Sequence, residues 1–224
     1  MAQQQTIGIL GLGVFGMSVA FELSQYDVDV IAVDSNPEHV QEVSDYITNS
    51  VVGDVNDLEL LEMIGLDQCD LVLIGIGSNL ASSVLALMNC KKLKIPRIIA
   101  KAKSRTYEEI LLELGADQVI LPEQDSGIRV ASKIMRSNIE EILRLDDHTS
   151  LLEFRCPQEW VGKSILELDL RNTYDLNLIG TREEPGEILN SRFDIYEPLE
   201  KDVFMVAVAS SHTFERHDYL NHFT

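Results

Sequence analysis

Residues 6–34 begin Thr-Ile-Gly-Ile-Leu-Gly-Leu-Gly-Val-Phe-Gly-Met and end Val-Asp-Val-Ile-Ala-Val-Asp. An apolar run leads into three glycines, an amphipathic stretch follows, and a second apolar run ends in Asp34. In a strand–turn–helix of this spacing, Gly11 makes the tight turn, Gly13 lets the backbone approach a phosphate, and Gly16 lets the helix pack closely on the strand. The helix N-terminus offers N–H groups to that phosphate, and Asp34 can accept hydrogen bonds from a ribose diol. The segment therefore predicts a nucleotide-binding unit of Rossmann type.

The alternation of strands and helices continues beyond this unit. Apolar runs and helical spacings that alternate at this interval are typical of a parallel, doubly wound α/β sheet. In one expected helix, Val84, Leu85 and Met88 share a face. Further strands are expected at 50–54, 70–75, 97–100 and 118–121, and further helices at 56–64, 79–92 and 107–114.

A long apolar stripe follows at residues 127–145. Its apolar side chains recur at helical spacing, which predicts one helix that closes the first domain. That helix could pack wholly on its own sheet or cross to a partner subunit. The pattern changes at 146–149, so we predict a nucleotide-binding domain over 1–145 and a second domain over 146–224. The stripe consists of Ile128, Ala131, Ile134, Met135, Ile139, Ile142 and Leu143.

The second domain is expected to be a small α+β unit. A sheet with so few covering elements needs a partner to bury its apolar face, which favours a homodimer. Its expected strands lie at 150–155, 176–181 and 203–209, its short helix at 164–169 and a turn at 183–187.

The composition excludes several classes of protein. The 224 residues carry a formal net charge of −19, from 18 Lys and Arg against 37 Asp and Glu, which disfavours binding to nucleic acid or to lipid headgroups. No apolar run approaches the roughly 20 residues of a membrane helix. Residues 1–5 are polar and lead directly into a strand, so we expect no signal peptide and a cytoplasmic location. Three cysteines without Cys-x-x-Cys spacing favour a reducing compartment over a disulfide scaffold.

Several segments together resemble the RCK family, the regulators of potassium conductance, and within it the cytosolic gating subunits of Ktr- and Trk-type potassium uptake systems. The resemblance covers nearly the whole chain, and the Gly-Ala-Asp…Pro-Glu segment discriminates best, because ordinary Rossmann dehydrogenases do not need it. The segments that carry it are 11–16, 33–34, 52–54, 98–101 and 115–123 in the first domain and 164–171 in the second.

The resemblance implies a regulatory subunit without enzymatic activity. In the family, homodimers assemble into a homo-octameric ring beneath a membrane-embedded potassium translocating subunit. Exchange of the bound nucleotide changes the shape of the ring and gates transport. The chain would then lie at the inner face of the membrane through its partner, without direct contact with lipid.

The resemblance also assigns roles to residues. The glycines would hold phosphates, Asp34 the ribose, Asp54 and Val55 the adenine, and Lys101 would face the phosphates. Glu123 would approach a neighbouring subunit's site and help to hold a divalent cation or sodium. The ligand would be an adenine nucleotide, either ATP/ADP or NAD(H). The expected cofactor-binding residues are Gly11, Gly13, Val14, Phe15, Gly16, Asp34, Ser35, Asp54, Val55, Gly75, Asn79, Lys101 and Glu123.

Val14 departs from the pattern of the relatives that read a triphosphate, which carry arginine inside the glycine loop. Valine cannot donate a hydrogen bond to a γ-phosphate. Three alternatives stay open: a cation among Lys101, Lys103 and Arg105 compensates, the loop does not distinguish ATP from ADP, or the ligand is a dinucleotide.

A second ligand is implied for the second domain, because Gram-positive members of the family bind cyclic di-AMP at the dimer interface. Ile165, Leu170, Arg171 and Asn177 match the positions used there. Aliphatic side chains can hold adenine faces, the guanidinium can pair with a phosphate, and the amide can read a polar edge. The alternative is that Ile165 and Leu170 are core residues and Arg171 makes a structural ion pair.

Two other classes of function compete with this interpretation. An NAD-dependent oxidoreductase would need a proton-transferring group beside the cofactor, and none of His39, His148, His212, His217 and His222 falls in a motif that supplies one. A redox-sensing transcription regulator with a Rossmann core would need a helix-turn-helix or a basic face, and the sequence has neither.

Overall fold

The computed structural model describes residues 5–77, 79–135, 139–146, 148–184 and 186–210. The chain divides into two compact units, Met1–Ser126 and Gly127–Thr224, each described here by itself. This division falls inside a helix and earlier than the domain boundary expected from the sequence at residue 146. The reason is that residues 139–144 pair with the second sheet.

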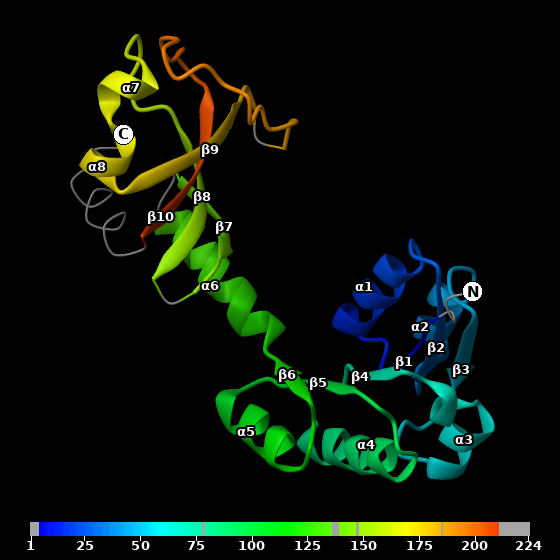
Figure 1. The fold of residues 1–224 in the computed structure, drawn as a ribbon. Helices are drawn as coiled ribbons and strands as arrows, with labels where there is room; N and C mark the ends of the chain where they lie inside the picture. Colours follow the sequence, from blue (N-terminus) through cyan, green and yellow to red (C-terminus); the bar gives the residue numbers. More distant parts are fainter. Residues whose placement is uncertain (1–4, 78, 136–138, 147, 185, 211–224) are drawn as a thin grey trace. The chain divides into compact units, whose positions relative to one another are not determined.

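The first unit is built on a six-stranded parallel sheet with the strand order β3-β2-β1-β4-β5-β6 (Figure 1). The chain starts in the middle of the sheet, winds outward to β3, and then crosses back to β4 beside β1. The order therefore reverses between β1 and β4, which is the place where open α/β sheets bind ligands. This confirms the predicted doubly wound sheet. The strands are β1 (Gln5–Leu10), β2 (Val28–Asp34), β3 (Asn49–Val52), β4 (Leu71–Ile74), β5 (Ile98–Lys101) and β6 (Gln118–Ile120).

Helices cover both faces of this sheet. Ile9 and Leu10 are neighbours on β1 and belong to two different buried clusters, because successive side chains of a strand point to opposite faces. The helices are α1 (Val14–Leu23), α2 (Pro37–Val43), α3 (Leu58–Met63), α4 (Leu80–Lys92) and α5 (Arg105–Glu113), with a short 3₁₀ turn η1 (Leu66–Gln68).

In helix α4, the three residues expected to share a face differ in burial, and Val84 is partly buried and packs on the core. Leu85 and Met88 are 53% and 41% exposed, whereas Ala86, Leu87 and Cys90 are fully buried. Ala86 and Cys90 have small side chains, which let the helix approach the sheet closely.

The second unit contains a four-stranded antiparallel sheet with the order β7-β8-β10-β9 (Figure 1). The fully buried Trp160 and Phe154 pack edge to face in its core, with ring centroids 6.0 Å apart. The described elements of this part are α6 (Pro122–Met135), which enters the unit from the first, and then β7 (Ile139–Arg144), β8 (Thr149–Arg155), α7 (Ile165–Leu168), α8 (Leu170–Tyr174), β9 (Leu176–Arg182) and β10 (Phe204–Ser210).

The single helix expected over 127–145 is wrong in its last third. Helix α6 begins at Pro122 and ends at Met135, and residues 139–144 form β7, whose Ile139 lies opposite Phe154 of β8. The register of β7 shifts between Glu141 and Leu143, and this bulge interrupts a plain alternation of apolar and polar residues. The side chains of Met135, Ile139 and Ile142 lie outside the described part of the chain.

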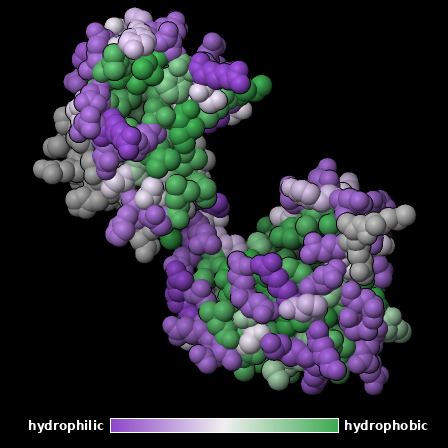
Figure 2. Space-filling view, viewed as in Figure 1, coloured by the Kyte–Doolittle hydropathy of each residue, from purple (hydrophilic) through white to green (hydrophobic). Residues whose placement is uncertain are grey.

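The hydropathy of the surface, the helices and the buried cysteines agree with what the composition indicates. In Figure 2, hydrophilic side chains cover most of the visible surface of the first unit, and a hydrophobic area is visible on the second. Among the described residues, no helix combines the length and hydrophobicity needed to span a bilayer. The cysteines are buried, and burial raises the pKa of the Cys69 and Cys90 thiols to about 12, which keeps both protonated.

Candidate functional site

The glycine loop joins β1 to α1. Gly11 has φ 98°, and its N–H donates to the Val33 carbonyl at 2.8 Å. A Cβ on Gly16 would lie 2.0 Å from the Gly11 carbonyl oxygen, so only glycine allows the helix to pack this closely. A Cβ on Gly13 would meet no atom within 4 Å. Gly13 is the N-cap of α1 and no side chain caps that end, so the helix presents its first N–H groups beside open space.

A cavity of about 390 Å³ opens beside this loop, where β1, β2, β4 and β5 end. Its volume lies within the range of small-molecule sites. The cavity brings together these residues of the predicted set: Gly11, Gly13, Asp34, Ser35, Asp54, Val55, Gly75 and Lys101. It is also lined by residues that the sequence analysis missed: His39, Gly53, Asn56, Ile76, Gly77 and Ser82.

The other predicted residues lie around the cavity without lining it. Val14 begins α1 and is 91% exposed. The Phe15 ring lies under Lys101, with the ammonium nitrogen 5.6 Å from the ring centroid. Asn79 caps α4 by accepting the N–H groups of residues 81 and 82. Gly16 packs against the loop backbone, and Glu123 is bonded to Lys101.

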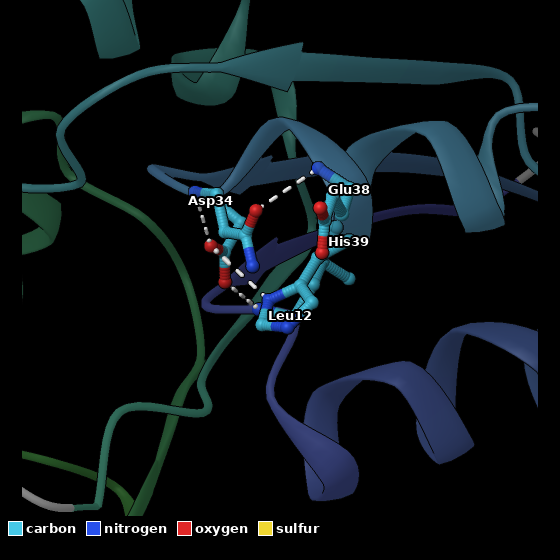
Figure 3. A network of polar contacts seen from close by, with 5 residues as sticks. Leu12, Asp34, Glu38 and His39 are labelled. Atoms are coloured by element: carbon cyan, nitrogen blue, oxygen red, sulfur yellow. Dashed lines mark hydrogen bonds and ion pairs between the residues drawn. The ribbon is translucent and has the colours of Figure 1, made fainter.

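Asp34 is the last residue of β2, and its carboxylate connects the glycine loop to this strand by a hydrogen bond (Figure 3). Its Oδ2 accepts the Leu12 N–H at 2.6 Å, and its Oδ1 accepts the Asn36 N–H at 2.7 Å. The Nδ1 atom of His39 lies 3.4 Å from Oδ1. A carboxylate has about four acceptor positions, so Asp34 keeps capacity for a ligand hydroxyl while it holds the loop.

Lys101 ends β5, and its Nζ donates to the Glu123 carboxylate at 2.6 Å. The Lys101 side chain is 13% exposed and that of Glu123 is 67% exposed. The hydrogen bond from Lys101 is the main cause that lowers the pKa of Glu123. The resemblance places Glu123 near a neighbouring subunit, and its role towards a second chain and a cation stays a prediction.

Asp54 and Asn56 form the end of the cavity that follows β3. Asp54 Oδ1 accepts both the backbone N–H and the side-chain amide of Asn56, at 2.9 and 3.0 Å. The Asn56 amide thereby fixes the orientation of the Asp54 carboxylate. Asn56 and His39 each follow the end of a parallel strand by a few residues. Polar residues at such positions are candidates for the ligand site, and this is the signal in the sequence that points to both.

The second unit has a cavity of about 330 Å³ between α7, α8, β9 and the segment before residue 196. All four residues predicted for a second ligand line it: Ile165, Leu170, Arg171 and Asn177. Ile165 and Leu170 also pack on the core, so the two alternatives for them are not exclusive. Within the described part of the chain, Arg171 makes no ion pair. The lining residues that the sequence analysis missed are Leu166, Asp169, Leu176, Leu178, Phe193 and Ile195.

Comparison with known proteins gives matches to both sequence and fold. The family model of the TrkA-N domain matches residues 7–122. The Ktr system potassium uptake protein C of Bacillus subtilis is 32% identical over 179 residues, which are 80% of this chain and 81% of that protein. The structure of the GsuK channel superposes with a TM-score of 0.69 at 18% identity, over 98% of this chain and 40% of the channel chain. A structure of the GsuK channel bound to NAD gives a TM-score of 0.63 at 17% identity, likewise over 40% of the channel chain.

Proposed function

The chain belongs to the TrkA-N family, and from this premise we propose that it is a nucleotide-sensing regulatory subunit that gates a membrane potassium uptake system. The observation that carries the proposal is the first cavity. It lies at the reversal point of the parallel sheet and unites the glycine loop, a strand-terminal aspartate and a lysine. These are the groups that a phosphate and a ribose require.

The ligand of this cavity is an adenine nucleotide. The α1 N-terminus and Lys101 bind phosphate oxygens, and Asp34 accepts the ribose hydroxyls. Asp54 and Val55 lie beside the base. One structural neighbour, the GsuK channel bound to NAD, supports this choice of ligand class.

The partner is a membrane-embedded potassium translocating subunit of Ktr or Trk type, which would hold the chain at the inner face of the membrane. The chain acts as a homodimer that assembles into an octameric ring. Exposed apolar side chains of α6, Ile128, Val130 and Ile134, support the alternative in which this helix contacts a second subunit. The net charge of −19 argues against contact with lipid headgroups or nucleic acid.

The role is regulatory rather than enzymatic. A dehydrogenase needs a proton-transferring group beside the nicotinamide. In the described residues, His39 is the histidine that lines the cavity, and it lies beside Asp34 at the ribose end. This placement suits positioning of the carboxylate better than hydride chemistry.

Asp34→Ala should weaken binding of adenine nucleotides by about 1.5–3 kcal/mol, the range for hydrogen bonds to a charged group. Titration calorimetry with ADP and NAD⁺ measures the change. Asp29→Ala is the matched control, because it removes the same charge from the same strand, where the carboxylate accepts only from Thr48 in the described contacts. Unchanged affinity of Asp34→Ala for both nucleotides would remove Asp34 from the site, and a wild-type chain that binds neither would contradict the proposed function.

We also propose that the second unit senses cyclic di-AMP. The second cavity supports this proposal, because it joins aliphatic side chains with Arg171 and Asn177. A two-fold dimer would present this set of residues twice to a two-fold symmetric ligand. In a chain of net charge −19, a ligand with two phosphates needs such a local cation.

Arg171→Ala should lower the affinity of the full chain for cyclic di-AMP by about 1.5–3 kcal/mol, because a charge-assisted phosphate contact is lost. Arg192→Ala serves as the control, since Arg192 is an exposed arginine of the same unit outside the cavity lining. Calorimetric titration of the three proteins decides the result. If the wild-type chain shows no saturable binding, the second cavity is not a sensor for this ligand.

A further inference from the structure

The cation that faces the first cavity is already bonded to an acid of the same chain. Two contacts hold the charged end of Lys101: its Nζ donates to Glu123 at 2.6 Å, and its ammonium lies over the Phe15 ring. The stem of the side chain packs so closely on Gly77 that a Cβ there would lie 2.9 Å from the Lys101 Cε. With 13% of its side chain exposed, Lys101 has little freedom to extend toward a distant phosphate. A ligand phosphate must therefore compete with Glu123 for the same ammonium group.

The other two cations that could assist are engaged elsewhere. The Lys103 ammonium lies 4.9 Å from the centroid of the Tyr107 ring, and Arg105 pairs with Glu108 at 2.8 Å. Neither lines the cavity, so the structure gives no support to compensation for Val14 by Lys103 or Arg105.

The fixed charges of the cavity are consequently unfavourable to highly charged ligands. Asp34 and Asp54 are acidic lining residues, and Lys101 is a basic one shared with Glu123. Since Coulomb energy grows with the product of the charges, ATP, with about four negative charges, suffers more from these carboxylates than NAD⁺, which carries about one.

Beside the glycine loop, Val14 and Ile76 offer apolar surface and no cation. Val14 follows the cavity-lining Gly13 and exposes 91% of its surface, and Ile76 lines the cavity from the loop after β4. A third phosphate would find no donor side chain on Val14 or Ile76. A second nucleoside would instead cover apolar surface that is otherwise exposed to water.

We infer that Glu123 is a built-in competitor for Lys101, and that the Lys101–Glu123 pair makes the cavity select nucleotides by charge, favouring a dinucleotide with one pyrophosphate over a nucleoside triphosphate. This inference rests on the proposed function, because it assumes that the first cavity holds an adenine nucleotide. It assigns to Glu123 a selectivity role within its own chain, set by a contact that the sequence does not reveal.

The test compares NAD⁺ and ATP by titration calorimetry on the full chain in EDTA. We expect wild-type protein to bind NAD⁺ at least about tenfold more tightly than ATP. Glu123→Gln should raise the affinity for ATP by about fivefold or more and that for NAD⁺ much less, because removal of one negative charge acts on the more highly charged ligand. Glu108→Gln is the matched control: it removes a glutamate of a first helical turn that pairs with Arg105 outside the cavity.

Each outcome decides a separate point. If wild-type protein binds ATP as tightly as NAD⁺ or more tightly, selection by charge is wrong. An equal change for both ligands in Glu123→Gln would reduce Glu123 to a structural residue and overturn the inference, while the proposed function would stand. Binding of neither nucleotide would overturn both. Val14→Arg gives an independent check, because a guanidinium at the loop should narrow the NAD⁺ preference at least about fivefold.

Discussion

Gly16→Val is expected to cost the first unit about 3 kcal/mol or more of its free energy of unfolding, because the new side chain overlaps backbone atoms that cannot move aside. Even a Cβ at this position would lie 2.0 Å from the Gly11 carbonyl oxygen and 3.0 Å from its carbon. The overlap is removed only if α1 separates from β1. That separation opens the glycine loop and destroys the phosphate site.

Urea unfolding followed by circular dichroism measures this loss. Trp160, the one tryptophan of the chain, lies in the core of the second unit, so its fluorescence reports that unit separately. We expect the dichroism transition of Gly16→Val to shift to lower urea while the Trp160 transition stays in place. A wild-type dichroism transition in Gly16→Val would show that the loop adapts and that the close approach is not required.

Gly13→Ala is the matched comparison within the same loop. Gly13 has φ −64°, and its added Cβ meets no protein atom within 4 Å, so the stability of the first unit should be unchanged. Because Gly13 lines the cavity, the methyl group should nevertheless lower nucleotide affinity by about tenfold. The two glycines thus separate the packing role from the ligand role of one motif.

The strands and helices of the first unit could be predicted from the sequence because apolar runs and glycine positions indicate the same elements. Buried parallel strands read as apolar runs such as Leu71–Ile74, and Gly115 ends the helix before β6 in a left-handed conformation. Strand order is different, since it depends on contacts between distant segments and no pattern encodes it. The resemblance to the RCK family is confirmed by the TrkA-N match.

The predictions failed where one pattern fits two structures. The apolar residues after Met135 were compatible with a helix, yet they form a strand because β8 offers its edge to pair with. In α4, Leu85 and Met88 share a face with the partly buried Val84 yet are exposed, while Ala86 and Cys90 are buried. Tertiary contact decided both cases.

The glycine motif located the first cavity but not all of its residues. His39 lies in α2, which follows β2, and Asn56 lies in the segment after β3. Both line the cavity, and hydrophobic periodicity does not encode which residues beyond a strand end reach it. Likewise, Lys101 and Glu123 were expected near phosphates and near another subunit, respectively. Their bond within one chain emerges only when β5 and α6 are placed in space.

The second unit holds a charge pair that the sequence conceals. Glu153 lies in a strand whose alternation places polar residues outward, yet it is 5% exposed and bonds to Arg182, which is 15% exposed. The two side chains reach across β10, which lies between β8 and β9 in the sheet. Loss of the carboxylate would break this ion pair in a site with little water, where removing one partner of a buried pair is costly.

Glu153→Ala should therefore lower the free energy of unfolding of the second unit by about 3–5 kcal/mol, read from the Trp160 fluorescence transition. The double variant Glu153→Leu/Arg182→Leu should recover most of that loss, because it removes both buried charges together. A loss in the double variant as large as in Glu153→Ala would assign the effect to packing instead of the broken ion pair. Because β9 carries both Arg182 and Asn177, Glu153→Ala should also weaken cyclic di-AMP binding without changing nucleotide affinity in the first unit.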